Sequence, residues 1–258
     1  MSITDRPVLI TGGTGFIGSH VARALLDRGR RVCLADIRGL SPEAKFVLGR
    51  HAATVPVEHA SIDNWPRLLE VVRHWQPRQV VHIGGIVDPL FLFKNPSVAL
   101  RVNVEGTVNV LECIRQSAVE RIVYYLQFVE PAVRGEKVRL ASGGPLPRDN
   151  THVRDIANLT AAVLDAPDDA DRVFYAATGK PLVTAAQAAK LVMELVPGAD
   201  IEIGDVLSED DQVELGFRGV LSIENARPQL GWQPTYSSLR DGIAEYVATY
   251  RTFLAGNK

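Results

Sequence analysis

Three regularly spaced glycines, Gly12, Gly15 and Gly18, are the residues whose type and spacing point most directly to a ligand. They follow an apolar run, residues 7–11, and precede a segment with helical spacing of apolar residues. One glycine permits a tight turn off a strand, one lets the backbone approach a pyrophosphate, and one lets the helix pack closely on the sheet. The N–H groups at the start of the helix would bind the diphosphate. A glycine-rich turn without a ligand is the alternative, but the strand before it and the helix after it favour a nucleotide site.

Asp36 ends the next apolar segment, residues 31–36, and lies 24 residues after Gly12. At that place in a dinucleotide site, a carboxylate accepts a hydrogen bond from a ribose 2′-hydroxyl and repels a 2′-phosphate. The position therefore predicts NAD as the cofactor. Arg38 is a nearby cation that could tolerate the additional phosphate, so NADP remains the less favoured alternative.

Composition and charge exclude several classes of protein. The 258 residues, 46% hydrophobic and 22% charged, fit one globular domain with at most a small satellite. The net charge is −2 and the basic residues are scattered, so we expect the chain to bind neither nucleic acid nor a membrane surface. No apolar run approaches the roughly 20 residues of a membrane span, and no signal peptide precedes the first strand. These features predict a cytoplasmic protein.

The two cysteines, Cys33 and Cys113, each lie within an apolar segment. This placement predicts buried free thiols in a reducing compartment. Because no Cys or His pairs occur at metal-ligand spacing, no metal is expected.

Short apolar strands alternate with helix-length segments through the first half of the chain. We expect strands at 7–11, 31–36, 55–58, 79–84 and 120–126, and helices at 16–28, 63–75 and 96–117. This alternation predicts an α/β fold with a parallel sheet covered by helices on both faces. Right-handed crossovers make it a Rossmann-type doubly wound sheet of order 3-2-1-4-5, with the glycine turn at the topological switch point.

The second half of the chain is less regular. The elements expected there are a strand at 136–141 and helices at about 152–165, 184–195 and 238–254. Residues 173–176, Val-Phe-Tyr-Ala, have the pattern of a further buried strand. We predict that this strand pairs directly with 120–126, because an unpaired buried edge leaves backbone polar groups without partners.

Five stretches have an order and spacing that together are highly specific. They are residues 11–18, 81–85, 103–112, 148–155 and 230–234. With these stretches the chain resembles the extended short-chain dehydrogenase/reductases, the NAD-dependent epimerase/dehydratase family. The resemblance implies an NAD-binding Rossmann domain over residues 1–134. Over residues 135–258 it implies a mixed segment with the strand 173–176 and a small substrate-binding subdomain.

The resemblance also implies which residues contact the cofactor. In the family a Gly-Asp pair after the third strand reaches the adenine; here Ala60 and Ser61 occupy those positions, so the usual carboxylate is missing and Ser61 offers a hydroxyl. Gly84 and Gly85 would let the nicotinamide lie against the end of the fourth strand, and Asn103 is either structural or part of a proton relay. The predicted cofactor-binding residues are Gly12, Gly15, Phe16, Ile17, Gly18, Asp36, Ile37, Ser61, Ile62, Ile83, Gly84, Gly85 and Asn103.

Arg148 matches a family arginine that often contacts phosphate on a nucleotide-sugar substrate. A solvated surface arginine is the alternative, because the sequence identifies no second phosphate ligand. The resemblance thus implies a small-molecule substrate, such as a nucleotide sugar. His82 and His152 have the pattern of buried packing histidines.

The proton-transfer pair of the family is absent from this chain. The family uses Tyr-x-x-x-Lys on one helix face, where the tyrosine exchanges a proton with the substrate and the lysine lowers its pKa. None of the six tyrosines, at positions 124, 125, 175, 236, 246 and 250, has a lysine four residues later. Tyr124 and Tyr125 lie at the proper end of the fifth strand, but no catalytic residue can be assigned.

The gap has a definite extent. The chain passes from the strand 120–126 to residues 135–140, a stretch that in the family follows the catalytic helix and the next strand. At least one helix-plus-strand unit, roughly 30 residues or more, is therefore absent. A natural degenerate member, an engineered deletion and an excised segment all remain explanations.

Three functions are compatible with these features. The first is an NAD-dependent oxidoreductase or epimerase/dehydratase, and the second is a non-catalytic NAD-binding pseudoenzyme or minimal scaffold. The third is a structural partner for a related full-length protein. Related enzymes usually dimerise through the fourth helix and the catalytic helix. Because half of that surface is missing, we predict a monomer or a non-standard homodimer.

Overall fold

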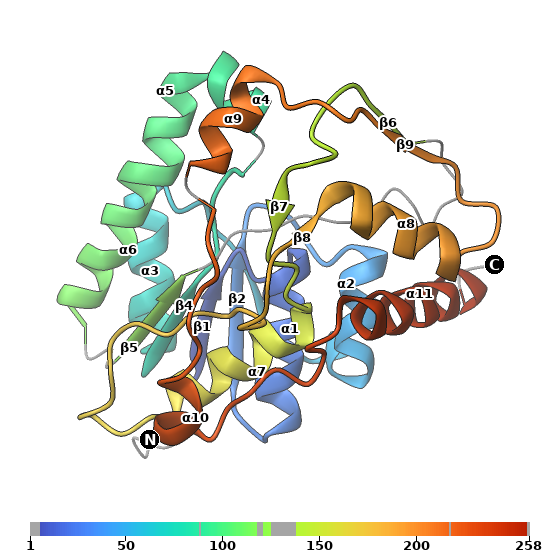
Figure 1. Ribbon diagram of the computed structural model, residues 1–258. Helices are drawn as coiled ribbons and strands as arrows, with labels where there is room; N and C mark the ends of the chain where they lie inside the picture. Colours follow the sequence, from blue (N-terminus) through green and yellow to red (C-terminus); the bar gives the residue numbers. More distant parts are fainter. Residues whose placement is uncertain (1–5, 88, 118–120, 125–137, 217, 257–258) are drawn as a thin grey trace. The chain divides into compact units, whose positions relative to one another are not determined.

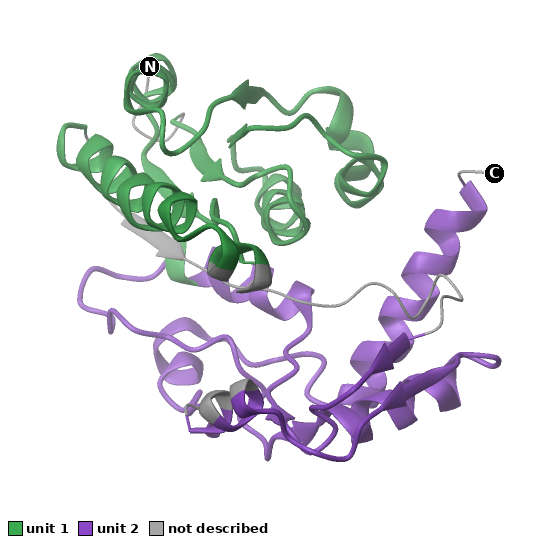
Figure 2. Ribbon diagram, turned by 90° about the horizontal axis from the view of Figure 1, so that it is seen from above, with its two compact units in different colours: residues 1–127, 163–165 green, residues 128–162, 166–258 purple. Residues whose placement is uncertain are grey.

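The computed structural model describes residues 6–87, 89–117, 121–124, 138–216 and 218–256 (Figure 1). The chain divides into two units (Figure 2). Unit 1 comprises residues 1–127 and 163–165, and unit 2 comprises residues 128–162 and 166–258. The predicted domain boundary, between residues 134 and 135, lies outside the described residues.

Unit 1 is a parallel sheet with helices between successive strands. Its elements are β1 (Val8–Thr11), α1 (Phe16–Asp27), β2 (Val32–Asp36), α2 (Pro42–Leu48), a 3₁₀ turn (Gly49–Ala53), β3 (Val57–His59), α3 (Trp65–Trp75), β4 (Gln79–His82), α4 (Pro89–Lys94), α5 (Pro96–Ala99), a π-helical turn (Leu100–Glu105), α6 (Gly106–Arg115) and β5 (Arg121–Tyr124). The strand order is β3-β2-β1-β4-β5, and every pairing is parallel. The predicted order 3-2-1-4-5 is confirmed.

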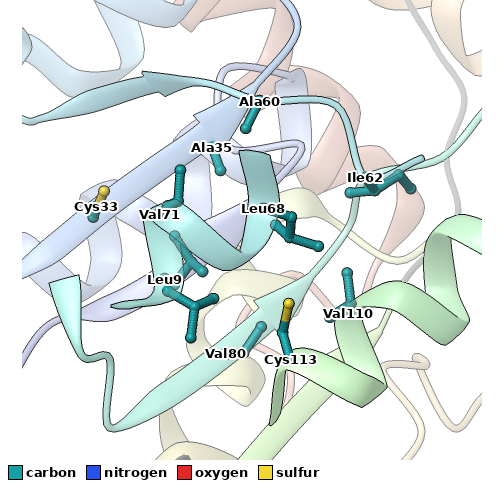
Figure 3. Close-up of a cluster of buried hydrophobic side chains, with 11 residues drawn as sticks. Leu9, Cys33, Ala35, Ala60, Ile62, Leu68, Val71, Val80, Val110 and Cys113 are labelled. Carbon is teal, nitrogen blue, oxygen red and sulfur yellow. The ribbon is translucent and has the colours of Figure 1, made fainter. Parts of the chain in front are cut away.

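The central strands are buried on both faces, as parallel strands covered by helices must be. Val8, Leu9 and Ile10 of β1 are each no more than 1% exposed. One face carries the cluster shown in Figure 3, in which strand residues contact α3 and α6. Its members are Leu9, Cys33, Ala35, Ala60, Ile62, Leu68, Val71, Val72, Val80, Val110 and Cys113.

Burial controls the chemistry of the two cysteines in this cluster. Loss of hydration raises the pKa of Cys33 to about 12 and that of Cys113 to about 11. Both are free thiols, as predicted, and both stay protonated near neutral pH.

Local capping explains where several helices begin. The Ser41 hydroxyl accepts a hydrogen bond from the Ala44 N–H, and Pro42 begins α2. Asn64 caps α3 in the same way by accepting from the Arg67 N–H. These short polar side chains bind N–H groups that have no partner inside the helix.

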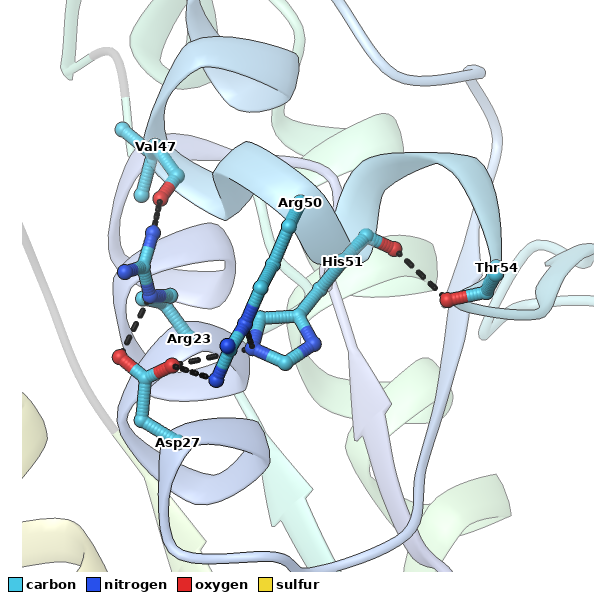
Figure 4. Close-up of polar contacts among 6 residues, drawn as sticks. All are labelled: Arg23, Asp27, Val47, Arg50, His51 and Thr54. Atoms are coloured by element: carbon cyan, nitrogen blue, oxygen red, sulfur yellow. Dashed lines mark hydrogen bonds and ion pairs between the residues drawn. The ribbon is translucent and has the colours of Figure 1, made fainter.

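Polar contacts join α2 and the 3₁₀ turn to α1 (Figure 4). Arg23 donates one hydrogen bond to the Val47 carbonyl at 3.2 Å and another to Asp27 at 2.5 Å. His51 Nε2 lies 2.9 Å from the same carboxylate, and the pKa of Asp27 is lowered by Arg23 and then by His51. Gly49 has a φ of +55°, and a Cβ there would lie 2.8 Å from Nη1 of Arg23. The positive φ at Gly49 therefore favours glycine, whereas the Arg23 guanidinium ends a flexible side chain that could move away from a Cβ.

Unit 2 contains short sheets and several helices. Its elements are β6 (Val138–Leu140), β7 (Pro147–Arg148), α7 (Val153–Leu164, whose last two residues belong to unit 1), β8 (Val183–Thr184), α8 (Ala185–Leu195), β9 (Ile201–Ile203), α9 (Glu209–Leu215), α10 (Ala226–Leu230) and α11 (Leu239–Gly256). β6 pairs with β9 in parallel, and β7 pairs with β8 antiparallel. The predicted strand at 136–141 and the three predicted helices are confirmed.

Buried polar contacts join the start of α7 to the segment that leads into α11. Asp155 is 1% exposed and accepts hydrogen bonds from the backbone N–H groups of Thr235 and Tyr236, each at 2.8 Å. Arg154 lies 2.7 Å from Glu245 of α11. A buried carboxylate such as that of Asp155 requires partners, and here its hydrogen bonds fix one element against another.

The prediction of a strand at 173–176 was wrong. These residues have no regular secondary structure, and Val173 and Tyr175 are 60% and 45% exposed. The Val173 carbonyl accepts a hydrogen bond from the side-chain amide of Asn225, at 3.0 Å. An apolar segment becomes a strand only where another strand supplies ladder hydrogen bonds. In the described part of unit 2, the Asn225 side chain, and not a neighbouring strand, bonds to the Val173 carbonyl.

Among the described residues, no helix has both the length and the apolar character needed to cross a membrane.

Candidate dinucleotide site

The glycine turn between β1 and α1 is shaped by two close backbone approaches. Gly12 has a φ of +68°, and a Cβ there would lie 2.7 Å from the Gly84 nitrogen. A Cβ on Gly18 would lie 2.3 Å from the Gly12 carbonyl oxygen. Both positions therefore require glycine for the turn itself, whether or not a ligand binds.

Gly15 differs from these two glycines, because a Cβ there would make one tight contact but no clash. Its φ is −72°, and a Cβ there would meet only the Gly12 oxygen, at 3.3 Å. Gly15 is also the N-cap of α1 and has no side chain to cap the helix. Phe16, Ile17 and Gly18 form the first helical turn, where backbone N–H groups point out of the helix. This arrangement suits an anion.

Asp36 lies beside the glycine turn, as predicted. One carboxylate oxygen accepts a hydrogen bond from the Thr14 N–H at 3.2 Å, and the other accepts from the Arg38 N–H at 3.3 Å. The carboxylate thus links the end of β2 to the turn after β1. The adjacent Ile37 is 57% exposed at the same edge of the sheet.

A carboxylate that the sequence reasoning missed lies near Ser61. The Ser61 hydroxyl donates a hydrogen bond to Asp63, which also lies 3.0 Å from Arg101. The hydrogen bond from Ser61, followed by the contacts with Arg101, lowers the pKa of Asp63. The signal was the Ser-Ile-Asp sequence, in which the acidic residue comes two positions later than expected. Ile62 is only 7% exposed, so its side chain belongs mainly to the core.

Asn103 holds the backbone that follows β4. Its side-chain oxygen accepts from the Ile86 N–H and its amide donates to the Ile86 carbonyl, both at 2.8 Å. The predicted helix 96–117 contains a π-helical turn at this point, and Asn103 lies within it. These two hydrogen bonds give Asn103 a structural contact, while its part in a cofactor site or a proton relay remains a hypothesis.

The glycines after β4 lie against this framework. A Cβ on Gly84 would lie 3.3 Å from both Ile62 and the Thr11 hydroxyl, and one on Gly85 would lie 3.3 Å from the Asn103 side-chain oxygen. The Ile83 N–H donates to the Thr11 carbonyl at 3.0 Å. The ends of β1 and β4 therefore converge at the predicted nicotinamide position.

His82 has more specific polar contacts than a packing histidine requires. It is 1% exposed, with Nδ1 2.6 Å from the Thr11 hydroxyl and Nε2 3.1 Å from the Thr107 hydroxyl. Burial lowers the pKa of His82 to about 4. The imidazole is therefore neutral at physiological pH.

Arg148 lies in unit 2, at the end of β7, in register with Val183 of β8. Burial and then the positive charge of Arg148 lower the pKa of Arg218. Arg218 is thus a second cation close enough to Arg148 to interact with it, which the sequence alone did not identify. The carboxylate of Asp211 lies in the same group and accepts hydrogen bonds from Ser142 and Ser208.

No catalytic group can be assigned among the described residues. The backbone of Tyr124 lies in β5, but its side chain and the whole of Tyr125 fall outside the described part of the chain. In that part, no three His, Cys, Asp or Glu side chains are grouped so that they could hold a metal ion.

Comparisons with known proteins identify the class of this fold. The model of the NAD dependent epimerase/dehydratase family matches residues 8–126. UDP-glucose 4-epimerase 4 of Oryza sativa subsp. japonica is 31% identical over 126 residues, which are 47% of this chain and 34% of that protein. The chain spans between 21% and 38% of the length of the first curated relatives that it matches.

Solved structures extend the likeness of fold over both units. The UDP-glucose 4-epimerase of Thermotoga maritima, solved with UDP-glucose, has a TM-score of 0.78 at 20% identity, over 96% of this chain and 99% of that one. The UDP-glucose 4-epimerase of Thermus thermophilus, in complex with NAD, has a TM-score of 0.75 at 20% identity, over 95% of this chain and 99% of that one. At these identities the likeness shows the fold alone.

The parallel sheet and glycine turn define unit 1 as a Rossmann-type α/β fold. Residues 8–126 match the NAD dependent epimerase/dehydratase family, the family that the sequence motifs resemble.

The low pKa of His82 predicts that stability falls as the pH falls. An exposed histidine in the unfolded chain titrates near pH 6.5, so between that pH and about pH 4 the unfolded state binds the additional proton. His82 should therefore contribute a loss of about 2 kcal/mol in the free energy of unfolding between pH 7 and pH 5. Burial also lowers the pKa of His152, which shifts stability in the same direction.

Urea unfolding at the two pH values, followed by circular dichroism, measures this loss for the wild type and for His82→Gln. The variant should lose about 2 kcal/mol less than the wild type, because glutamine does not titrate. An equal loss in both proteins would show that His82 does not set this pH dependence.

Proposed function

We propose that this chain binds NAD at the carboxyl edge of the unit 1 sheet and a nucleotide sugar in unit 2. The observation that carries the proposal is the geometry at Gly15. Apart from one contact with the Gly12 oxygen, no atom beyond the two chain neighbours lies within 4 Å of a Cβ there, at the N-terminus of an uncapped α1, and Asp36 is bonded to the same turn. Space beside backbone N–H groups suits a diphosphate, and a strand-end carboxylate suits a ribose.

In this proposal each end of the cofactor has its own residues. The first turn of α1 would bind the pyrophosphate, and Asp36 the adenosine ribose, with Ile37 beside it. Ser61, Ile62 and Asp63 would flank the adenine. Ile83, Gly84 and Gly85, held by Asn103, would support the nicotinamide half. Bound NAD would supply a hydride acceptor for a secondary alcohol.

The preference for NAD over NADP rests on the carboxylate of Asp36. A 2′-phosphate placed against it would be repelled, while a 2′-hydroxyl could donate a hydrogen bond. Both carboxylate oxygens already accept backbone hydrogen bonds, but each oxygen has a second lone pair. Arg38 is the residue through which NADP could be tolerated.

The nucleotide-sugar proposal rests on Arg148 and Arg218. Two guanidinium groups that raise the electrostatic potential at one place form a site for a diphosphate, which carries two negative charges. The fold is shared with a UDP-glucose 4-epimerase solved with UDP-glucose, which supports this substrate class. Asp211, which accepts hydrogen bonds from two serines, is close enough to Arg148 to neutralise part of its positive charge.

The two candidate functions differ in whether the chain catalyses a reaction. The match to the epimerase/dehydratase family favours an enzyme, whereas the lack of any Tyr-x-x-x-Lys favours a dinucleotide-binding protein without turnover. The match to the family model ends at residue 126, shortly after β5. In the family, the catalytic helix would follow this point. We favour binding without efficient turnover.

Replacing Gly15 separates ligand binding from folding. Gly15→Ala places a methyl group 3.3 Å from the Gly12 oxygen, which a small shift accommodates, but in the path of the pyrophosphate, so NAD affinity should fall by at least about tenfold. The melting temperature should fall by only a few degrees. Calorimetric titration with NAD and thermal unfolding are the measurements.

Gly39→Ala is the matched control, because no atom lies within 4 Å of the added Cβ. It should change neither the NAD affinity nor the melting temperature. If Gly15→Ala bound NAD like the wild type, the diphosphate would have to lie elsewhere.

Replacing Asp36 tests the cofactor preference. Asp36→Ala should weaken NAD by about tenfold and NADP by less, because the repulsion of the 2′-phosphate is removed together with the ribose contact. Affinities for both cofactors are compared with those of Asp36→Asn, which keeps the side-chain shape and removes the charge. Equal losses for NAD and NADP in Asp36→Ala would exclude Asp36 from the ribose site.

Turnover should be negligible at saturating NAD. A positioned general acid or base contributes typically 10²–10⁴ in rate, and this chain lacks the tyrosine and lysine that supply it in the family. NADH absorbance across a panel of nucleotide sugars and secondary alcohols is the measurement. Turnover in the usual enzyme range, lost in Tyr124→Phe or Tyr125→Phe, would reveal a substitute base and support the enzyme alternative.

We also propose a monomer or a homodimer that does not use the family helix bundle. An apolar stripe on the helical segment 96–115 is about half exposed: Leu100, Val104, Val108 and Leu111. A stable interface needs about 800 Å² from each partner, and the second bundle helix is absent from the sequence. Sedimentation at about 10 µM should show a monomer, or a dimer that Val108→Glu leaves intact. A dimer that Val108→Glu dissociates would show bundle pairing through this stripe.

A further inference from the structure

We propose that His82 is a positioning residue of the dinucleotide site. It connects Thr11, which bonds to Gly84, with Asn103, which bonds to Ile86. The proposal rests on the proposed cofactor site, because this backbone is where the nicotinamide half is expected. Its evidence is a chain of hydrogen bonds within unit 1.

The first part of this chain joins β1 to the end of β4. The Thr11 hydroxyl lies 2.6 Å from Nδ1 of His82, and the Gly84 N–H donates to the same hydroxyl oxygen at 3.4 Å. Thr11 is fully buried at the last position of β1. Thr11 therefore connects the imidazole to the first residue of the supporting backbone.

The second part joins β4 to the helix that follows it. Nε2 of His82 lies 3.1 Å from the Thr107 hydroxyl, which donates to the Asn103 carbonyl at 2.7 Å. Asn103 in turn makes two hydrogen bonds to the backbone of Ile86. One imidazole thus lies between the contact at Gly84 and the contact at Ile86.

The hydrogen-bond directions require one form of the ring. Because the Thr107 proton is used toward the Asn103 carbonyl, the Thr107 oxygen accepts from Nε2–H. Nδ1 then carries a lone pair and accepts from the Thr11 hydroxyl, which leaves the Thr11 oxygen to accept from Gly84. All of these bonds are satisfied together only by the neutral ring with its proton on Nε2. Burial, which keeps the pKa of His82 low, maintains that form.

The consequence is a difference between the two halves of the cofactor. ADP, which has no nicotinamide, would contact only the glycine turn, Asp36 and the adenine residues. NAD would also contact the backbone at 84–86. A change at His82 or Thr11 should therefore weaken NAD more than ADP, whereas a general loss of packing would weaken both alike.

The experiment measures two properties of the same variants. His82→Phe keeps the ring volume without polar atoms, Thr11→Val removes one hydroxyl, and Thr11→Ser restores it. Amide hydrogen exchange is measured in the free protein, and affinities for NAD and ADP are measured by calorimetry. Thr160→Val is the matched control, because Thr160 is fully buried and its hydroxyl bonds to Ile156 of its own helix.

In His82→Phe, amide exchange should accelerate at Gly84 and Ile86 but not at Val81 in β4. In Thr11→Val the acceleration should be strongest at Gly84. Both variants should weaken NAD by about three- to tenfold, the value of one hydrogen bond, and ADP by less than about twofold. Thr11→Ser and Thr160→Val should behave like the wild type.

Unchanged exchange at Gly84 and Ile86, or equal losses for NAD and ADP, would overturn the positioning role. If His82→Phe does not fold, Thr11→Val and its serine rescue decide the same question. If the wild type binds neither nucleotide, the proposed cofactor site fails. Exchange in the free protein still decides whether His82 positions this backbone.

Discussion

The close approach of the Gly12 and Gly84 backbones is the constraint on which the rest of unit 1 depends. A Cβ on Gly12 would lie 2.7 Å from the Gly84 nitrogen, so the ends of β1 and β4 meet at this distance only because Gly12 has no side chain. The turn can then lead into α1 with its N–H groups directed toward the sheet edge, and Gly18 can pack against the Gly12 carbonyl. The backbone predicted to contact the diphosphate and the backbone predicted to contact the nicotinamide therefore touch each other at Gly12 and Gly84.

Buried polar residues provide the rigidity that glycines cannot. Glycine-rich backbone loses more conformational entropy on folding than other backbone, and it offers no side chains for packing. In this chain, Asp36 bonds to the turn, and Thr11, His82 and Asn103 bond to the segment after β4. The hydrogen bonds lie beneath the proposed cofactor surface and leave that surface to the backbone.

The two units differ in how strongly they resemble known proteins. The family model matches residues 8–126, whereas the likeness of fold extends through nearly the whole chain. Unit 2 keeps its fold through contacts such as Asp155 with the backbone at residues 235–236. The catalytic pair, which would have followed β5 in the family, has no counterpart in the sequence.

The sequence by itself determined the sheet and the glycine turn, because buried parallel strands and helix starts have local patterns. Strand order, α1, Asp36 and the buried cysteines followed from periodicity and spacing, and the Ser41-Pro42 start of α2 was a usable signal that was overlooked. Only the tertiary structure decided the remaining features. Residues 173–176 have the pattern of a strand, but strand formation depends on a neighbour that no local pattern reveals. Arg148 interacts with Arg218, and His82 connects Thr11 to Thr107, because long-range packing brings these polar atoms within hydrogen-bond or electrostatic reach.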